Sequence, residues 1–323
     1  MFAAPRLAFG QAQRGGTVHR VGFVATTSPL AEMSGPDPAN PFARAFVHGL
    51  RDLGYVQGTN LALEIRTLEG KAERFEAVVA DLVRLKTDVI FLPTSLLVVR
   101  AQKVAPQMPI VGLVVPSYLI SSGLVQSMAR PGGTITGLSI DVDEQLEAKR
   151  LELLLELMPP ASRIAYLGLR EEWERPHVHN MRAAAQRLGA TVVHLDTGQG
   201  DFASAFSRLK REQANAFIVE RSPRSYGRRH EIGRLALASG LPGSCAASEI
   251  VEQGCLMSYA PDTLDWGRRA AVYVDRILKG AKPGDLAIEA PAKFELTINA
   301  KTARALGITI PQSLLLRADR VIE

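Results

Sequence analysis

Charged side chains follow several apolar segments of this chain at the places where a strand is predicted to end. Arg170 follows the segment from Arg163 to Leu169, Glu220 and Arg221 follow a later apolar segment, and Glu249 lies in a loop beyond it. A zwitterionic ligand needs a cation or helix-terminal amides for its carboxylate, and an acid or carbonyl groups for its ammonium. Arg170 and Glu220 are candidates for these roles. Surface residues that only rim a cleft fit the pattern equally well, so both interpretations stay open.

Hydroxyl-bearing side chains end three apolar segments in the first half of the chain. The segments RVGFVAT, DVIFLPTS and PIVGLVVPS each end in such a loop. The candidate ligand contacts there are Thr26, Thr27, Ser28, Thr94, Ser95, Pro116 and Ser117, and Tyr259, at the end of a later short strand, completes the set with Arg170, Glu220 and Glu249. The assignment depends on position, because ligands of parallel sheets bind beyond the carboxyl ends of the strands.

The elements that must position these residues alternate between strand and helix. Buried apolar runs separated by amphipathic stretches of ten to fifteen residues predict right-handed βαβ units and parallel sheets. The stretch from Gly123 to Pro159 ends one such set and begins another of similar style. A length of 323 residues also favours two domains. We therefore expect an α/β protein with two Rossmann-like parallel-sheet lobes.

The predicted division gives each lobe two pieces of chain, because the chain returns after Tyr259. Residues 19–138 and 260–290 are expected to form lobe 1, and residues 139–259 and 291–323 lobe 2. The lobes are then joined by a hinge of about three crossings. Residues 1–18 resemble either the end of a secretory signal peptide, with its charged start and full apolar core missing, or an ordinary disordered tail.

Motifs for several kinds of chemistry are missing from the sequence. The turn after the first predicted strand reads ATTSPLAEMSG, without the GxGxxG of dinucleotide-binding proteins, and GxxxxGK[ST] and GxSxG are also absent. His177 and His179 lie two apart and point to different faces of a helix, which does not favour a metal site. We expect no cofactor, no metal and no catalytic residues.

The charge distribution and the hydropathy of the sequence limit which classes of partner are expected. The formal charge is +5, and the densest basic cluster is the run from Arg221 to Arg229, which is compatible with a phosphate-binding patch or with a solvated basic face. No nucleic-acid partner is expected. No apolar run approaches the ~20 residues of a membrane span. Cys245 and Cys255 form a disulfide or remain two buried free thiols.

Segments spread over most of the chain resemble one family. The resemblance lies in GLRDLGYVQGTNLALEIRTLEG (49–70), ADLVRLKTDVIF (80–91), GLVQSMARPGGTITGLS (123–139), KRLELLLELMP (149–159), GCLMSYAPD (254–262), RRAAVYVDRILKGAKPGDLAIEAPAKFELTINAKTARALGITIP (268–311) and the final LLLRADRVIE. Together they resemble the ABC-transporter substrate-binding proteins, whose studied members include tryptophan- and other aromatic amino acid-binding proteins. The resemblance covers the chain from about Arg20 to Glu323.

This resemblance implies a type I periplasmic-binding-protein fold that encloses a small molecule as its lobes close. It also implies a periplasmic location, a membrane permease with a separate ATPase as partners, and no catalysis. Two stretches depart from the family pattern: Val115-Pro116-Ser117-Tyr118 stands where relatives usually have a Gly-Asp-Pro-Val type loop, and Gly254–Ala260 stands where they usually read GGLMSYG. The first departure removes an acidic residue near the expected cleft.

The leading hypothesis is a solute-binding component of an ABC importer that captures a small organic ligand, an amino acid or another small carboxylate. The alternative is a ligand-sensing module that works with a signalling or regulatory partner. Neighbouring genes for a permease and an ATPase would favour the first hypothesis, and genes for a kinase or cyclase the second.

Overall fold

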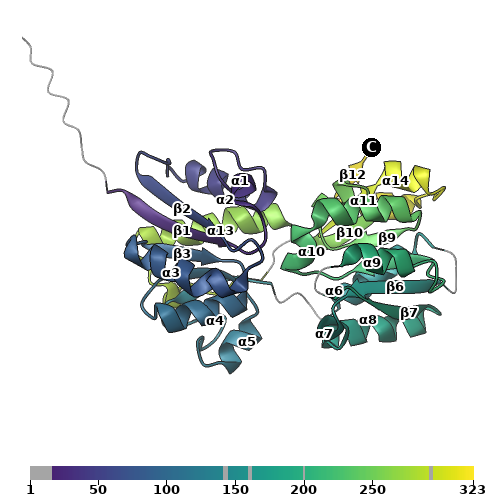
Figure 1. Cartoon of the computed structure of the whole chain (residues 1–323), viewed down its shortest axis with the longest axis horizontal. Helices are drawn as coiled ribbons and strands as arrows, with labels where there is room; N and C mark the ends of the chain where they lie inside the picture. Colours follow the sequence, from purple (N-terminus) through teal and green to yellow (C-terminus); the bar gives the residue numbers. More distant parts are fainter. Residues whose placement is uncertain (1–16, 141–144, 159–161, 199–200, 291–293) are drawn as a thin grey trace, which may run out of the picture.

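Two β-sheets, each with helices packed against it, make up the fold (Figure 1). The structure is a computed structural model that describes residues 17–140, 145–158, 162–198, 201–290 and 294–323. Lobe 1 denotes the five-stranded sheet with the helices that pack on it, and lobe 2 the seven-stranded sheet with its helices. The predicted α/β fold with two parallel-sheet lobes is confirmed.

The sheet of lobe 1 is parallel throughout and has the strand order β2-β1-β3-β4-β5. Its strands are β1 (His19–Ala25), β2 (Leu61–Thr67), β3 (Val89–Leu92), β4 (Ile110–Val114) and β5 (Ile135–Ser139). The apolar run predicted from Arg20 to Thr26 forms β1 in the interior of the sheet, which explains why the five residues from Val21 to Ala25 are buried.

Helices cover both faces of this sheet. They are α1 (Leu30–Met33), α2 (Pro41–Asp52), the 3-10 turn η1 (Ala72–Arg74), α3 (Phe75–Arg84), α4 (Ser95–Val104), α5 (Pro116–Ser121), α13 (Thr263–Leu278) and the 3-10 turn η2 (Pro283–Asp285). Phe91 packs with α2 and α13 on one face, whereas its neighbours Ile90 and Leu92 pack with α3 and α4 on the other. Successive side chains of a strand point to opposite faces, so one short strand supports two cores.

Two glycines let α2 and α13 approach closely. A Cβ on Gly49 would lie 2.9 Å from the Ala271 Cβ, and one on Gly267 would lie 2.8 Å from the Ala45 Cβ. Helix α13 comes late in the sequence, so this contact fixes the returning chain onto lobe 1.

The sheet of lobe 2 has the order β12-β11-β10-β9-β8-β6-β7. Strands β6 to β10 are parallel, whereas β11 and β12 are parallel to each other and run antiparallel to the rest. Its strands are β6 (Arg163–Gly168), β7 (Thr191–Asp196), β8 (Ala216–Val219), β9 (Gly243–Cys245), β10 (Met257–Pro261), β11 (Phe294–Asn299) and β12 (Arg320–Ile322). Two apolar cores lie on its two faces.

The helices of lobe 2 follow the sequence pattern with one correction. They are α6 (Leu146–Leu155), α7 (Arg170–Trp173), α8 (Pro176–Arg187), α9 (Phe202–Arg208), α10 (Pro223–Gly227), α11 (Arg229–Ser239), α12 (Ser248–Glu252), α14 (Ala300–Ala305) and α15 (Gln312–Leu315). The sequence pattern predicts N-caps at Asp201 and Asn299, and both are confirmed. The sequence pattern also predicts one helix from Ser225 to Ser239, and this prediction is wrong: Ser222 caps a separate short helix, and the helical run is interrupted at Arg228.

The chain passes between the lobes next to β5. The returning segment pairs with that strand, because the Ser139 N–H donates to the Glu289 carbonyl at 2.7 Å. The passage from β10 to α13 lies at Pro261 and Asp262. The other two predicted crossings include residues 141–144 and 291–293, which lie outside the described residues, as do residues 1–16 of the predicted tail. The division at 138/139 and 259/260 stays a prediction; β5 ends at Ser139 and β10 at Pro261.

Cys245 and Cys255 are joined by a disulfide, with their Cα atoms 6.3 Å apart and both side chains buried. The sequence left this pairing open. The bridge closes the loop that carries α12, which follows β9 and precedes β10 in the chain.

Candidate functional site

The loop after β1 brings its three predicted residues to the edge of lobe 1. Thr26 and Thr27 are half-buried. Ser28 is buried, and its Oγ accepts a hydrogen bond from Asn40 Nδ2 at 3.2 Å, while its carbonyl accepts one from Thr67 Oγ1 at 2.7 Å. Since Asn40 caps α2, Ser28 connects the loop to a helix start. The two threonines are the more available for a ligand.

The loops after β3 and β4 lie side by side, because the Ser95 Oγ accepts a hydrogen bond from the Val115 N–H at 2.6 Å. Thr94 is half-buried and caps α4 by accepting from the Leu97 N–H. Pro116 is buried at the start of α5, and Ser117 beside it is exposed. Ser95 therefore shapes the edge, while Thr94 and Ser117 are the more accessible side chains.

In lobe 2 the carboxylate of Glu220 is completely buried and already bonded. It accepts from the Leu169 N–H at 2.7 Å and the Ser222 hydroxyl at 3.0 Å, and it pairs with Arg224. A Cβ on Gly168 would lie 2.8 Å from its Oε2, so this glycine makes room for the carboxylate. Glu220 thus ties the ends of β6 and β8 to α10.

Arg170 and Glu220 are predicted to contact one ligand together, but the structure does not bring their charged groups to a common site. Arg170 is exposed at the first position of α7, whereas the Glu220 carboxylate lies beneath the loop between β6 and α7. Arg170 remains accessible as a rim cation.

Glu249 connects the two lobes. It is 7% exposed, and its Oε1 accepts from the Tyr226 hydroxyl at 3.1 Å and from the Thr263 hydroxyl at 2.7 Å. Thr263 is the first residue of α13, which packs on lobe 1. Burial and the nearby Glu249 carboxylate raise the pKa of Tyr226 well above its ordinary value, which keeps this hydroxyl a donor. Tyr259, in β10, is stacked on Phe294 with ring centroids 5.7 Å apart and packs against the core on the other face of the sheet from α12.

A buried ion pair lies under the same edge of lobe 2. Arg150 is fully buried and pairs with Glu147 at 2.7 Å, while its Nη2 donates to the carbonyls of Val219 and Ser244, each at 2.9 Å. These carbonyls belong to β8 and β9. The guanidinium therefore holds together the two strands whose ends carry Glu220 and the disulfide.

Arg221 is the residue that the sequence pattern placed beside Glu220 without including it among the candidate contacts. It is half-buried, and its Nε is enclosed without a hydrogen-bond partner. Burial lowers the pKa of its guanidinium below the ordinary value. The signal in the sequence was its place directly after a strand, which it shares with Arg170.

The arginine run from Arg221 to Arg229 does not form one basic patch. Arg224 pairs with Glu220, Arg228 with Glu231 at 2.7 Å, and Arg229 with Glu32 at 2.6 Å. Most of this positive charge is therefore neutralised within the protein. That argues against a phosphate-binding patch.

The loops at the two sheet edges meet. The pair between Glu32 in α1 and Arg229 in α11 crosses between the lobes. A Cβ on Gly227 would lie 2.4 Å from the Thr27 Oγ1. In Figure 1, α7 and α10 lie on the side of lobe 2 that is turned toward lobe 1. The carboxyl ends of the strands in both lobes thus border one interlobe region.

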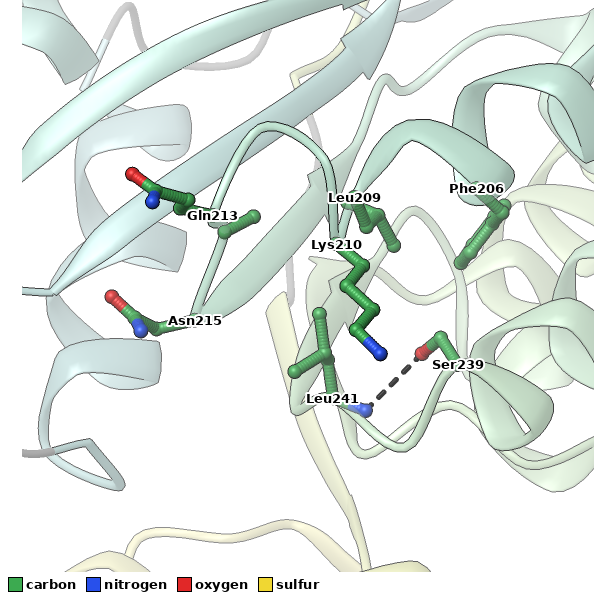
Figure 2. Close-up of a pocket in the computed structure, with 8 residues that line it drawn as sticks. Phe206, Leu209, Lys210, Gln213, Asn215, Ser239 and Leu241 are labelled. Atoms are coloured by element: carbon green, nitrogen blue, oxygen red, sulfur yellow. Dashed lines mark hydrogen bonds between the residues drawn. The ribbon is translucent and has the colours of Figure 1, made fainter.

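A separate hollow of about 410 Å³ lies elsewhere in lobe 2 (Figure 2). Its lining includes Asn215, directly before β8, and Leu241, before β9. It therefore opens at the amino ends of these strands, opposite Glu220. None of the candidate ligand contacts lines it.

Within the described ranges, no three His, Cys, Asp or Glu side chains are grouped to hold a metal ion. A search of the same residues for a helix that could cross a membrane also finds none.

Two α/β lobes with polar strand ends turned toward one region define the class of two-lobed solute-binding proteins. The model of the ABC transporter substrate binding protein family matches residues 38–322, and the chain belongs to this family, whose members bind substrates and are not enzymes. The chain is 23% identical to the tyrosine-binding protein of Clostridioides difficile over 291 residues, which cover 87% of this chain and 80% of that protein.

Solved structures show the same fold. The ABC domain in complex with L-Trp from Streptococcus pneumonia matches with a TM-score of 0.79 and 23% identity, covering 95% of this chain and 100% of that one. A conserved domain protein from Vibrio cholerae matches with a TM-score of 0.78 and 22% identity, covering 94% and 100%. The recognition of the family from sequence segments is confirmed.

Proposed function

We propose that this protein captures a small organic ligand, an amino acid or another small carboxylate, between its lobes and delivers it to a membrane permease driven by a separate ATPase. The proposal includes a periplasmic place of action. The observation that carries it is the meeting of the two sheet edges, where hydroxyl side chains of lobe 1 border charged side chains of lobe 2. Relatives named for binding tyrosine and tryptophan make aromatic amino acids the first compounds to examine.

The proposed contacts fall into two groups. Polar side chains that remain exposed or half-buried at the two edges are proposed to touch the ligand: Thr26, Thr27, Thr94, Ser117, Arg170 and Arg221. Side chains that are already bonded or packed are proposed to shape the site: Ser28, Ser95, Pro116, Glu220, Glu249 and Tyr259. Both walls are needed, because a ligand shifts the open–closed equilibrium only through its different affinity for the two states.

The test is titration calorimetry with amino acids, aromatic acids and small amides, combined with small-angle scattering. We expect at least one compound to bind and to reduce the radius of gyration. Thr94→Val is expected to weaken the binding of that compound. Ser207→Ala, an exposed change in α9, is the matched control and should leave the binding unchanged. Absence of any binder together with an unchanged radius of gyration would count against the proposal.

Delivery needs its own experiment. We expect the protein to stimulate ATP hydrolysis by its permease and ATPase, sought among the neighbouring genes and reconstituted in vesicles. If it instead associates with a neighbouring kinase or cyclase and leaves the transporter unaffected, the ligand-sensing alternative is favoured.

A further inference from the structure

One guanidinium at the edge of lobe 2 lacks a protein partner. Arg221 follows β8 directly, at the strand end that borders the interlobe region. Its Nε is buried without an acceptor, and the Arg221 side chain forms no hydrogen bond or ion pair with any residue in the described ranges. The charged side chains that act on it electrostatically are those of Glu147, Arg150 and Glu172.

Each acid around Arg221 already has its own cation. The pairs are Arg150 with Glu147 at 2.7 Å, Arg224 with Glu220, and Arg175 with Glu172 at 3.7 Å. In addition, His177 lies 3.6 Å from Glu172 and, as the main cause, holds the pKa of that carboxyl below its ordinary value. The cluster is therefore left with one positive charge, that of Arg221.

An unpaired guanidinium in this position is unfavourable for the empty protein. Burial disfavours the charged form, and a buried N–H without an acceptor loses the hydrogen bond it would make in water. Replacement by an apolar side chain would remove both penalties. A group that lowers stability at a ligand-binding edge is expected where the ligand supplies the missing partner.

The missing partner has a definable chemistry. A carboxylate accepts two parallel hydrogen bonds from a guanidinium. One surplus charge matches a monoanion, whereas a phosphate dianion would leave one negative charge unpaired. The residues of lobe 1 that face the region, Thr26, Thr27, Thr94 and Ser117, are neutral hydroxyls, which suit the uncharged polar end of the same molecule.

We propose that Arg221 binds the carboxylate of the ligand held between the lobes, and that the ligand class is therefore the monocarboxylates. This inference rests on the proposed function. It differs from the role expected for Arg170, which is exposed and retains its hydration without a ligand.

The test uses pairs of probes that differ only in the acid group: L-tyrosine with L-tyrosinamide, L-tryptophan with L-tryptophanamide, and 3-phenylpropionate with 3-phenylpropanamide. In calorimetry we expect acids to bind the wild type about 10- to 100-fold more tightly than their amides. Arg221→Gln and Arg221→Met are expected to remove this difference, and Arg221→Lys to retain part of it. Arg234→Gln, an exposed change in α11, should leave it intact.

Thermal unfolding of the ligand-free variants separates binding from structural support. Arg221→Met is expected to unfold at or above the wild-type temperature, because it removes an unpaired charge. An unfolding temperature of Arg221→Met clearly below that of Arg234→Gln would assign Arg221 a structural role and overturn the proposal. Equal binding of an acid by the wild type and Arg221→Met would overturn the anchor but leave the proposed function standing. If no probe and no other compound bound the wild type, the proposed function itself would fail.

Discussion

The ion pair between Glu32 and Arg229 is expected to control how readily the lobes close. Arg229 Nη2 and Glu32 Oε2 are 2.6 Å apart. The Glu32 side chain is 32% exposed and the Arg229 side chain 6%. We propose that Glu32→Gln and Arg229→Gln each shift the equilibrium toward the open arrangement, because the pair joins α1 of lobe 1 to α11 of lobe 2.

The magnitude follows from the burial of the two partners. Exposed pairs contribute about 0–1 kcal/mol, whereas removing one partner of a buried pair costs about 3–5 kcal/mol. With one partner buried and the other one-third exposed, we expect about 1–3 kcal/mol, which corresponds to roughly a 5- to 150-fold change in the closed-to-open ratio. The apparent ligand affinity should weaken by up to that factor.

Small-angle scattering and calorimetry on the single and double variants test this expectation. Each single variant should increase the radius of gyration and weaken ligand binding, and the double variant should add little to either effect. Arg228→Gln is the matched control, because the neighbouring arginine pairs with Glu231 inside its own lobe. The reasoning is refuted if Arg229→Gln lowers only the stability to urea, with the radius of gyration and the affinity unchanged.

Three further changes test the internal supports of the site. Replacing Cys245 and Cys255 together by Ser should lower the free energy of unfolding by about 3 kcal/mol, from the lost loop constraint; an unchanged urea midpoint would contradict this. Glu220→Gln should cost about 3 kcal/mol, because it breaks a buried pair with Arg224, and wild-type stability in this variant would show that the amide replaces every bond of the carboxylate. Gly267→Ala should cost about 1–3 kcal/mol by overpacking α13 against α2; an equal or higher melting temperature would mean that the helices separate without penalty.

Local features of the fold were predictable from the sequence. Asp201 caps the start of α9, and Gly240 ends α11. Each acts within one turn of chain, so neighbouring residues suffice to recognise them. The break at Arg228 was not predictable from helical periodicity. It depends on Ser222, which caps the short helix α10. The position of that helix is fixed by Glu220, which accepts a hydrogen bond from Leu169 in the loop between β6 and α7.

The candidate site was predictable as a set of positions but less so as a set of interactions. Parallel strands end at one edge, which places residues that follow β1, β3 and β8 near that edge. Whether an acid there is free depends on long-range partners. Glu249 is bonded to Thr263 on α13, fourteen positions along the chain, and its carboxylate thereby joins two lobes instead of being available in a loop.

The two interlobe arginines have opposite effects on the empty protein. Arg229 gains a carboxylate partner where the lobes meet, so it favours closure. Arg221 has no such partner, and further loss of water around it on closing would cost free energy. A ligand carboxylate removes that cost, so closure becomes favourable chiefly when the anion is present. On this view the unpaired charge opposes closure of the empty protein, and the same charge selects the compound that favours closure.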